Sequence, residues 1–189
     1  MFMTQLESAV AGVVTKEMKV VAEKERMDEE VLCSLVAAGK VVIPCNKQHT
    51  SISPEGIGKR LRTKVNVNLG TSKDVTDYDS EIEKVNRAIR LGAESIMDLS
   101  THGDTRIFRR KLIETSPVMI GTVPIYDSVI HHQKDLGELT AQDFLDTIRL
   151  HAQDGVDFIT IHSGITRKTI DQIKNHKRML NIVSRGGSL

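Results

Sequence analysis

The feature that most constrains the fold is a regular alternation that begins at Lys64. Short apolar segments alternate with longer segments in which apolar residues recur every three or four positions. The expected strands cover residues 64–70, 95–100, 118–126, 157–164 and 181–187, and the expected helices cover residues 77–91, 104–115, 140–154 and 166–175. Because repeated strand–helix units fold with parallel strands and right-handed crossovers, this part of the chain predicts a parallel α/β sheet.

The residues before this alternation predict a small helical segment. Thr15 and Asp28 stand where N-caps are expected, and Gly39 can end the helix that Asp28 begins. The expected elements are helices within residues 4–38, a strand at 40–44 and a loop over 45–63. We therefore expect two parts, a helical preface over residues 1–63 and the first part of an α/β domain over residues 64–189.

Composition excludes several partners. The chain has 26 basic and 25 acidic residues, so no field spread over the molecule would attract nucleic acid or an anionic membrane. The densest basic run, residues 59–64, is expected to be a solvated loop. No apolar stretch approaches the roughly 20 residues that span a bilayer, and the first residues lack the pattern of a signal peptide. We expect a cytoplasmic protein that binds neither nucleic acid nor membranes.

The sequence predicts no metal ligand. Cys33 and Cys45 are twelve residues apart, which fits neither a disulfide framework nor a close metal pair, so both are expected to be reduced. His131 and His132 could suggest a metal, but apart from Asp135 no carboxylate or thiol stands near them at ligand spacing. We expect these histidines in a solvated loop.

Polar residues gather where the expected strands end. In parallel sheets these carboxyl ends meet at one edge, where helix N-termini also favour anions. The sequence therefore predicts a ligand site at this edge. The residues concerned are Asn66, Asn68, Met97, Asp98, Ser100, Thr122, Tyr126, His162, Ser163, Ser184 and Arg185.

Most of these positions have two interpretations. Asn66 and Asn68 share one strand face. They are either ligand contacts or a buried structural pair of amides. His162 is a core histidine or a substrate contact and proton donor, and Tyr126 contacts a ligand or caps a loop. Met97 is expected to pack in the core. Arg185 makes the best chemical case, because a guanidinium beside glycines suits phosphate.

The motifs "VVIP", "GIGKRLRTKVNVNLGTS", "IMDLS", "GTVPIY", "ITIHSGITR" and "NIVSRGG" occur in the order found in the phosphomethylpyrimidine synthase family. The sequence resembles this family over nearly all of its length. The resemblance implies a (β/α)8 TIM-type barrel, of which this chain would hold about the first five strands. It also implies a carbon–carbon lyase of thiamine biosynthesis, which rearranges aminoimidazole ribonucleotide into hydroxymethylpyrimidine phosphate by radical chemistry.

The resemblance also implies the substrate contacts and the cofactors. The implied contacts are Asn68, Met97, Tyr126, His162, Ser184, Arg185 and Gly186, with the last three holding the phosphate and Met97 packing against a ring. No catalytic residue is assigned. The family uses S-adenosylmethionine, a 4Fe-4S cluster and zinc, whose ligands in the family lie beyond the Ser-Arg-Gly turn. We therefore expect this chain to be the N-terminal part of a homodimeric enzyme, and to be inactive alone.

Three alternatives stay open. A paralogous family, 5-hydroxybenzimidazole synthase, uses the same substrate and radical chemistry, and the motifs present here serve both. The second alternative is that the chain is a truncated binding module that lacks catalysis. A phosphosugar-binding α/β barrel with accidental similarity is the third alternative.

Overall fold

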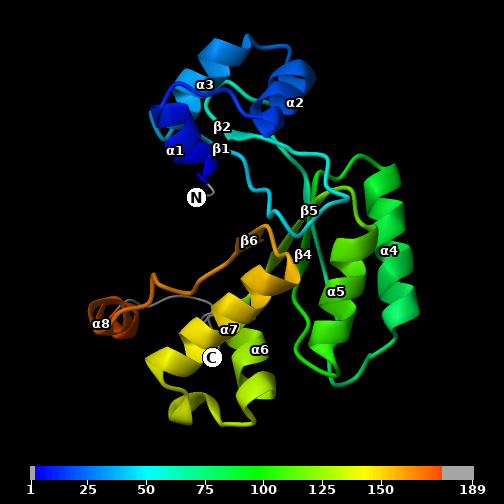
Figure 1. Ribbon diagram of the computed structural model, residues 1–189. Coiled ribbons are helices and arrows are strands. Elements are labelled where there is room, and N and C mark those ends of the chain that lie inside the picture. The colour runs from blue at the N-terminus through cyan, green and yellow to red at the C-terminus, as the bar shows by residue number, and fades with distance from the viewer. Residues whose placement is uncertain (1–2, 176–189) are drawn as a thin grey trace. The chain divides into compact units, whose positions relative to one another are not determined.

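The computed structural model describes residues 3–175 and divides into two compact units, residues 1–159 and 160–189 (Figure 1). The first unit contains the helical segment and a parallel sheet. In its described part, the second unit contains helix α8 (Arg167–Asn175), at the place where the sequence predicts a helix. The expected boundary between residues 63 and 64 stays a prediction.

Three short helices confirm the helical character of the first residues. They are α1 (Gln5–Val10), α2 (Lys16–Glu25) and α3 (Glu29–Ala37). The side chains of Thr15 and Asp28 accept hydrogen bonds from backbone N–H groups in the first turns of α2 and α3, as their N-cap positions predict. Apolar side chains of these helices bury a core of their own, to which Val41 and Ile43 also contribute.

A two-stranded antiparallel sheet follows the helices. Strand β1 (Val41–Val42) confirms the predicted strand, and it pairs with β2 (Ile57–Gly58), which lies in a segment expected to be a loop. Gly58 has a φ of +147°, and a Cβ atom there would lie 2.2 Å from the carbonyl oxygen of Lys40. This second strand was missed because its close approach to β1 depends on a glycine, which sequence patterns associate with loops.

The main sheet has four parallel strands in sequence order. They are β3 (Asn66–Leu69), β4 (Ser95–Asp98), β5 (Met119–Thr122) and β6 (Phe158–Ile159). The parallel α/β sheet is thus confirmed, although each strand is shorter than expected. Within residues 3–175 the sheet does not close on itself, so the barrel stays a prediction, and the strand expected at 181–187 lies outside the described residues.

Four helices accompany the sheet in the first unit. Helices α4 (Tyr78–Arg90), α5 (Thr105–Thr115) and α7 (Ala141–Asp154) confirm predicted helices. Helix α6 (Pro124–His132) was not expected, and neither was the 3-10 turn η1 (Leu136–Glu138). The strand predicted to reach Tyr126 ends at Thr122, because Pro124 begins a helix, a position at which its missing N–H costs nothing.

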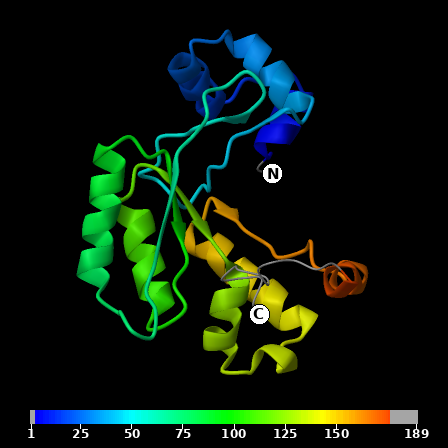
Figure 2. The ribbon, with the colours of Figure 1, turned by 180° about the vertical axis from the view of Figure 1, so that it is seen from behind.

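One face of the main sheet packs against helices. Leu69, Ile96 and Ile120 point to this face and form a core with apolar residues of α4 and α5. Figure 1 shows α4 and α5 side by side along the sheet, and Figure 2 shows the packed pair of α6 and α7 from behind. We call this side of the sheet the helix face.

The basic run at residues 59–64 is only partly a solvated loop. Lys59 and Arg60 are exposed, but the side chain of Lys64 is only 5% exposed, and its Nζ lies 2.5 Å from Oε1 of Glu25. Arg62 pairs with Glu94, with 2.8 Å between Nη1 and Oε1. The later residues of the run therefore connect α2 to the sheet through ion pairs.

Candidate functional site

The face of the sheet opposite the helix face carries Asn68 and Met97, two of the predicted substrate contacts. Side chains alternate along a strand, and paired residues of neighbouring parallel strands point the same way. The register pairs Asn68 with Met97 and Met97 with Gly121, so these three share a face. We call this side the amide face. Its residues are Asn66, Asn68, Ser95, Met97, Met119, Gly121 and Phe158.

The two asparagines of the amide face are exposed and joined to each other. Nδ2 of Asn66 donates to Oδ1 of Asn68 at 3.0 Å, and Oγ of Ser95 donates to Oδ1 of Asn66 at 2.9 Å. Both interpretations of this pair, as ligand contacts and as a structural pair of amides, stay predictions. Because its oxygen accepts from Asn66, Asn68 has its Nδ2 group on the other side of the amide, in position to donate to a ligand.

An apolar strip lies next to these amides. Met97 is 9% exposed and is the register partner of Asn68, whereas the core of the helix face lies on the other side of its strand. The ring of Phe158 lies against Gly121, where a Cβ atom would come within 2.3 Å of it. Amides beside a flat apolar strip can bind a planar heterocycle, by hydrogen bonds at its edge and packing on its face.

Tyr126 stands at the end of the next strand along, in the first turn of α6. It is half-buried, and its backbone N–H donates to the carbonyl oxygen of Val123 at 3.0 Å. Asn68, Met97 and Tyr126 thus come from three consecutive strand–helix units of the first compact unit. Tyr126 thus belongs to the same compact unit as Asn68 and Met97, and its contact with a substrate stays a prediction.

The other predicted site residues lie elsewhere. His162 is exposed and belongs to the second compact unit. Ser184, Arg185 and Gly186 lie outside the described residues, and with them the predicted phosphate turn. Their roles stay predictions.

Two further residues of the predicted edge point to the helix face instead. Asp98 and Thr122 are both buried there, and Asp98 accepts hydrogen bonds from the N–H and the hydroxyl of Ser100, both at its Oδ1. Burial raises the pKa of Asp98 to about 6, against the hydrogen bonds from Ser100 and the charge of Arg109. These residues belong to the packing between sheet and helices.

Sequence reasoning missed a buried group of charged residues beside Thr122. We call it the carboxyl-end cluster, and its members are Thr105, Arg109, Thr122, Asp127, His151 and Asp154. Arg109, from α5, donates from Nη1 to Asp127 at 3.1 Å and from Nη2 to Asp154 at 2.9 Å. Its guanidinium, only 1% exposed, is therefore paired with carboxylates of two other helices. No local pattern in the sequence marks these partners, since they are 18 and 45 residues away.

His151 completes this cluster from α7. Its Nε2 lies 2.8 Å from Oδ2 of Asp127, and its Nδ1 lies 2.8 Å from Oγ1 of Thr122. Burial lowers the pKa of His151, and the hydrogen bond to Asp127 does not outweigh burial and the charge of Arg109. The ring is therefore neutral near pH 7, with its proton on Nε2 facing the carboxylate.

A second buried histidine–aspartate pair lies at the opposite, amino-terminal end of the strands. His49 Nδ1 is 2.7 Å from Oδ2 of Asp157, the residue before β6, and its Nε2 is 2.8 Å from the carbonyl oxygen of Ser116. Asp157 also accepts from the backbone N–H groups of Asn46 and Ile120. Burial lowers the pKa of His49, but the hydrogen bond and charge of Asp157 outweigh it, so the pKa is raised.

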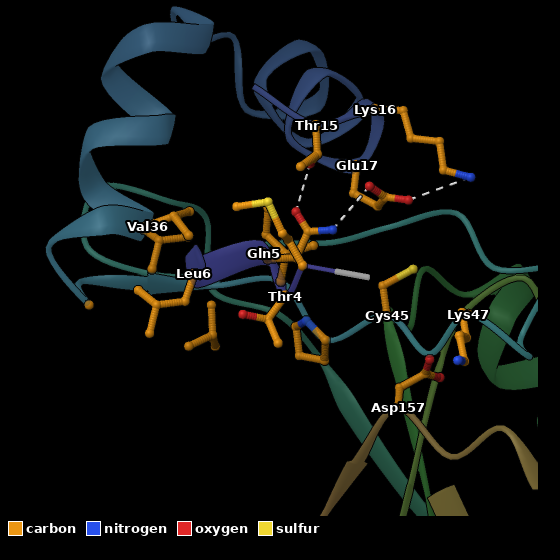
Figure 3. A pocket seen from close by; sticks show the side chains of 16 residues that line it. Thr4, Gln5, Leu6, Thr15, Lys16, Glu17, Val36, Cys45, Lys47 and Asp157 are labelled. Atoms are coloured by element: carbon orange, nitrogen blue, oxygen red, sulfur yellow. Dashed lines mark hydrogen bonds and ion pairs between the residues drawn. The ribbon is translucent and has the colours of Figure 1, made fainter. Parts of the chain in front are cut away.

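A pocket of about 690 Å³ lies at this amino-terminal end (Figure 3). Its walls come from α1, from the start of α2, from α3 and the segment after it, and from Asp157. Figure 3 shows Gln5 between Thr15 and Glu17, joined to each by a hydrogen bond. Of the predicted substrate contacts that the structure describes, none lines this pocket, and Asn68 and Met97 on the amide face are not among its walls.

The described residues do not fit a metal or an iron–sulfur cluster. Within residues 3–175, no group of three or more His, Cys, Asp or Glu side chains could hold a metal ion. Cys33 is buried in the helical core, and burial raises the pKa of Cys45 to about 11, which keeps it a thiol rather than the thiolate that clusters require.

The prediction of a solvated loop for the paired histidines is wrong. His131 and His132 end helix α6. His132 Nε2 lies 2.9 Å from the carbonyl oxygen of Asp143 in α7. This contact connects the two helices.

No helix in the described part of the chain is both long and apolar enough to cross a bilayer.

Several curated proteins to which this chain is similar are phosphomethylpyrimidine synthases. The chain is 56% identical over 188 residues to the phosphomethylpyrimidine synthase of Clostridioides difficile, and 55% identical to those of Clostridium perfringens and Clostridium kluyveri. Each match covers 100% of this chain but only 43% of the relative's length. A family model described as "Radical SAM ThiC family" matches residues 4–189, almost the entire chain. The chain therefore belongs to the radical SAM ThiC family.

Proposed function

We propose that this chain supplies the substrate-binding part of a phosphomethylpyrimidine synthase. The observation that carries the proposal is its 53–56% identity, over its full length, to enzymes of that name. The whole enzyme would rearrange aminoimidazole ribonucleotide into hydroxymethylpyrimidine phosphate, as a carbon–carbon lyase of thiamine biosynthesis. The four parallel strands would then be the first part of a (β/α)8 barrel, with the amide face inside.

The amide face supports this role through its chemistry. The Nδ2 group of Asn68 would donate to an acceptor on the ribose or the imidazole, and Met97 would pack against the imidazole ring. Tyr126 and His162 would contribute further hydrogen bonds. Ser184, Arg185 and the amide of Gly186 would hold the phosphate, to which a guanidinium and glycine N–H groups are suited.

The cofactors are assigned by the family and not by this chain's described side chains. S-adenosylmethionine with a 4Fe-4S cluster supplies the radical chemistry in this family, and zinc is its auxiliary metal. The described residues hold neither metal group, so we place those ligands in the part of the relatives that this chain does not span. On this proposal the chain alone would bind substrate without turnover.

We also propose a cytoplasmic homodimer. Both cysteines are free thiols, which suits a reducing compartment. Within the described sheet, strand β3 stands at an edge, and an exposed strand edge favours association. Light scattering of the purified chain would measure the mass of the assembly.

A chimera tests the proposed function directly. Residues 4–189 of this chain would replace the matching residues of the Clostridioides difficile enzyme, which is 56% identical over this region. In a strain without its own phosphomethylpyrimidine synthase, the chimera should restore growth without added thiamine. The same chimera with Asn68→Ala should restore it poorly, whereas Asn86→Ala, an exposed asparagine on α4, should have no effect.

Two results would contradict the proposal. A folded chimera that restores no growth would show that this chain does not serve thiamine biosynthesis. If the same chimera made 5-hydroxybenzimidazole, the paralogous activity would be correct instead. Mass spectrometry of the product formed from aminoimidazole ribonucleotide distinguishes the two.

A binding measurement isolates the amide face. Calorimetry of the 189-residue chain with aminoimidazole ribonucleotide should show an affinity about 3- to 10-fold weaker in Asn68→Ala, the loss expected for one neutral hydrogen bond. Asn86→Ala is again the matched control. Equal affinity of the Asn68→Ala variant and the wild-type chain would remove Asn68 from the site.

A further inference from the structure

Helix α6 begins without the side-chain N-cap that the other α-helices of the first unit have. Its N-cap residue, Val123, makes no side-chain hydrogen bond, and Pro124 occupies the first turn. By contrast, the side chains of Asp77, Asp104 and Thr140 cap helices α4, α5 and α7. The position of the first turn of α6, which carries Tyr126, must therefore be set by other contacts.

Asp127, next to Tyr126, provides those contacts. Its Oδ1 accepts a short hydrogen bond from the hydroxyl of Thr105. Its Oδ2 accepts from Nη1 of Arg109 at 3.1 Å and from Nε2 of His151 at 2.8 Å. Asp127 is only 5% exposed, so three donors from α5 and α7 hold one buried carboxylate of α6 in place.

His151 extends this connection to the sheet. Its Nδ1 meets the hydroxyl of Thr122, the last residue of β5, at 2.8 Å. A threonine, a histidine and an aspartate in a row resemble the residues of a nucleophilic site. However, Thr122 is 2% exposed and points to the helix face, so its hydroxyl cannot meet a substrate on the amide face. These three residues therefore hold elements of the structure in place and do not act on a substrate.

We propose that Asp127, Arg109 and His151 are positioning residues that fix the first turn of α6, and thereby aim the side chain of Tyr126 at the substrate. The link to substrate rests on the proposed function, but the link to Tyr126 does not. Asp127 follows Tyr126 directly in the chain, and its carboxylate joins α5, α6 and α7 at the end of β5. A shift of this carboxylate would therefore turn the tyrosine.

The composition provides a reporter for this inference. The chain has no tryptophan and two tyrosines, so a Tyr78→Phe background leaves Tyr126 as its only strong fluorophore. Tyr78 stacks on Phe108 with 5.5 Å between the ring centroids, a contact that phenylalanine preserves. Quenching of tyrosine emission by acrylamide then reports the exposure of Tyr126 alone.

In this background, His151→Leu should change the quenching constant of Tyr126 about 2-fold, because leucine fills the space but donates no hydrogen bond to Asp127. His151→Gln, whose amide can donate to the carboxylate, should restore most of the wild-type value. The matched control is His49→Leu, which removes the other buried histidine of a histidine–aspartate pair. It should lower the melting temperature without changing the quenching of Tyr126.

Calorimetry with aminoimidazole ribonucleotide completes the test. His151→Leu should weaken binding about 10-fold, and His49→Leu should not weaken it at 25 °C, where both variants are folded. If His151→Leu does not fold, Thr105→Val, which removes one donor to Asp127 at constant shape, takes its place.

Unchanged quenching of Tyr126 in the folded variant would overturn the inference. A wild-type chain that binds no aminoimidazole ribonucleotide, while Tyr126 still responds to His151→Leu, would overturn the proposed function and leave the positioning role standing.

Discussion

Two buried histidine–aspartate pairs lie at opposite ends of the same sheet, and the pKa values of their histidines shift in opposite directions. His151 and Asp127 at the carboxyl end are separated by 2.8 Å, and His49 and Asp157 at the amino end by 2.7 Å. The pKa of His151 is lowered, mainly by burial, whereas Asp157 outweighs burial and raises the pKa of His49. Distance to the carboxylate therefore does not decide the direction in which the pKa of the histidine shifts.

The difference lies in the neighbours of each carboxylate. Asp127 is also bound by Arg109, whose positive charge already compensates it and repels a second cation on the imidazole. Asp157 receives its other hydrogen bonds from neutral backbone N–H groups, so a protonated His49 can balance its charge. The direction of the pKa shift of such a histidine can thus be inferred only when the other charged partners of the aspartate are also considered.

The largest effect on stability is expected from removing the positive charge of Arg109. Arg109→Met should lower the free energy of unfolding by about 3–5 kcal/mol, because it deprives the buried carboxylate of Asp127 of its only cation partner among the described residues. His49→Leu should cost about 1–3 kcal/mol, since Asp157 keeps two backbone donors. Urea denaturation of both variants measures these free energies. Equal costs would contradict the inference that the two aspartates differ in their charged neighbours.

A smaller effect is expected from Gly121→Ala on the amide face. The new Cβ atom would displace the ring of Phe158, at a cost of about 1–3 kcal/mol. Because Phe158 follows Asp157, the shift should reach the amino-end pair and leave the carboxyl-end cluster in place. In NMR spectra, the ring signals of His49 should move and those of His151 should not. Gly137→Ala, in open space, is the control.

The smallest effect concerns pH and has opposite signs at the two ends. With its lowered pKa, His151 stabilises the fold above about pH 6.5, and this contribution is lost as pH falls through its folded-state pKa. With its raised pKa, His49 stabilises the fold below about pH 6.5, and this contribution is lost as pH rises through its folded-state pKa.

Between pH 8 and pH 5, the cost of His151→Leu should therefore shrink, and the cost of His49→Leu should grow. Urea denaturation at four pH values provides the measurement. Parallel pH profiles of the two variants would show that the pKa values of the two histidines do not shift in opposite directions.

Periodicity predicted most of the fold, and its failures have physical causes. The parallel strands and helices α4, α5 and α7 follow from apolar spacing, because one stripe of each helix must cover the sheet. Helix α6 was missed because "VMIGTVPIY" continues an apolar run, although Pro124 is a good first helical residue. Strand β2 was missed because its close approach to β1 requires Gly58, and sequence patterns associate glycine with loops.

The candidate site was predictable only where strand geometry places its residues. Asn68 and Met97 lie on one face because strand alternation and parallel register place them there. By contrast, Arg109 and His151 acquire their roles from partners on other helices, and no spacing within α5 or α7 indicates those partners. Long-range pairing of buried charges has no local signature in a sequence.

The order of the strands has a consequence for how the chain assembles as it is synthesised. Each strand of the sheet pairs with the one made just before it, so every new strand–helix unit finds its partner already in place. The contact between His49 and Asp157 instead joins residues 108 positions apart. The loop around His49 must therefore wait for β6, and its closure would be a late step in folding.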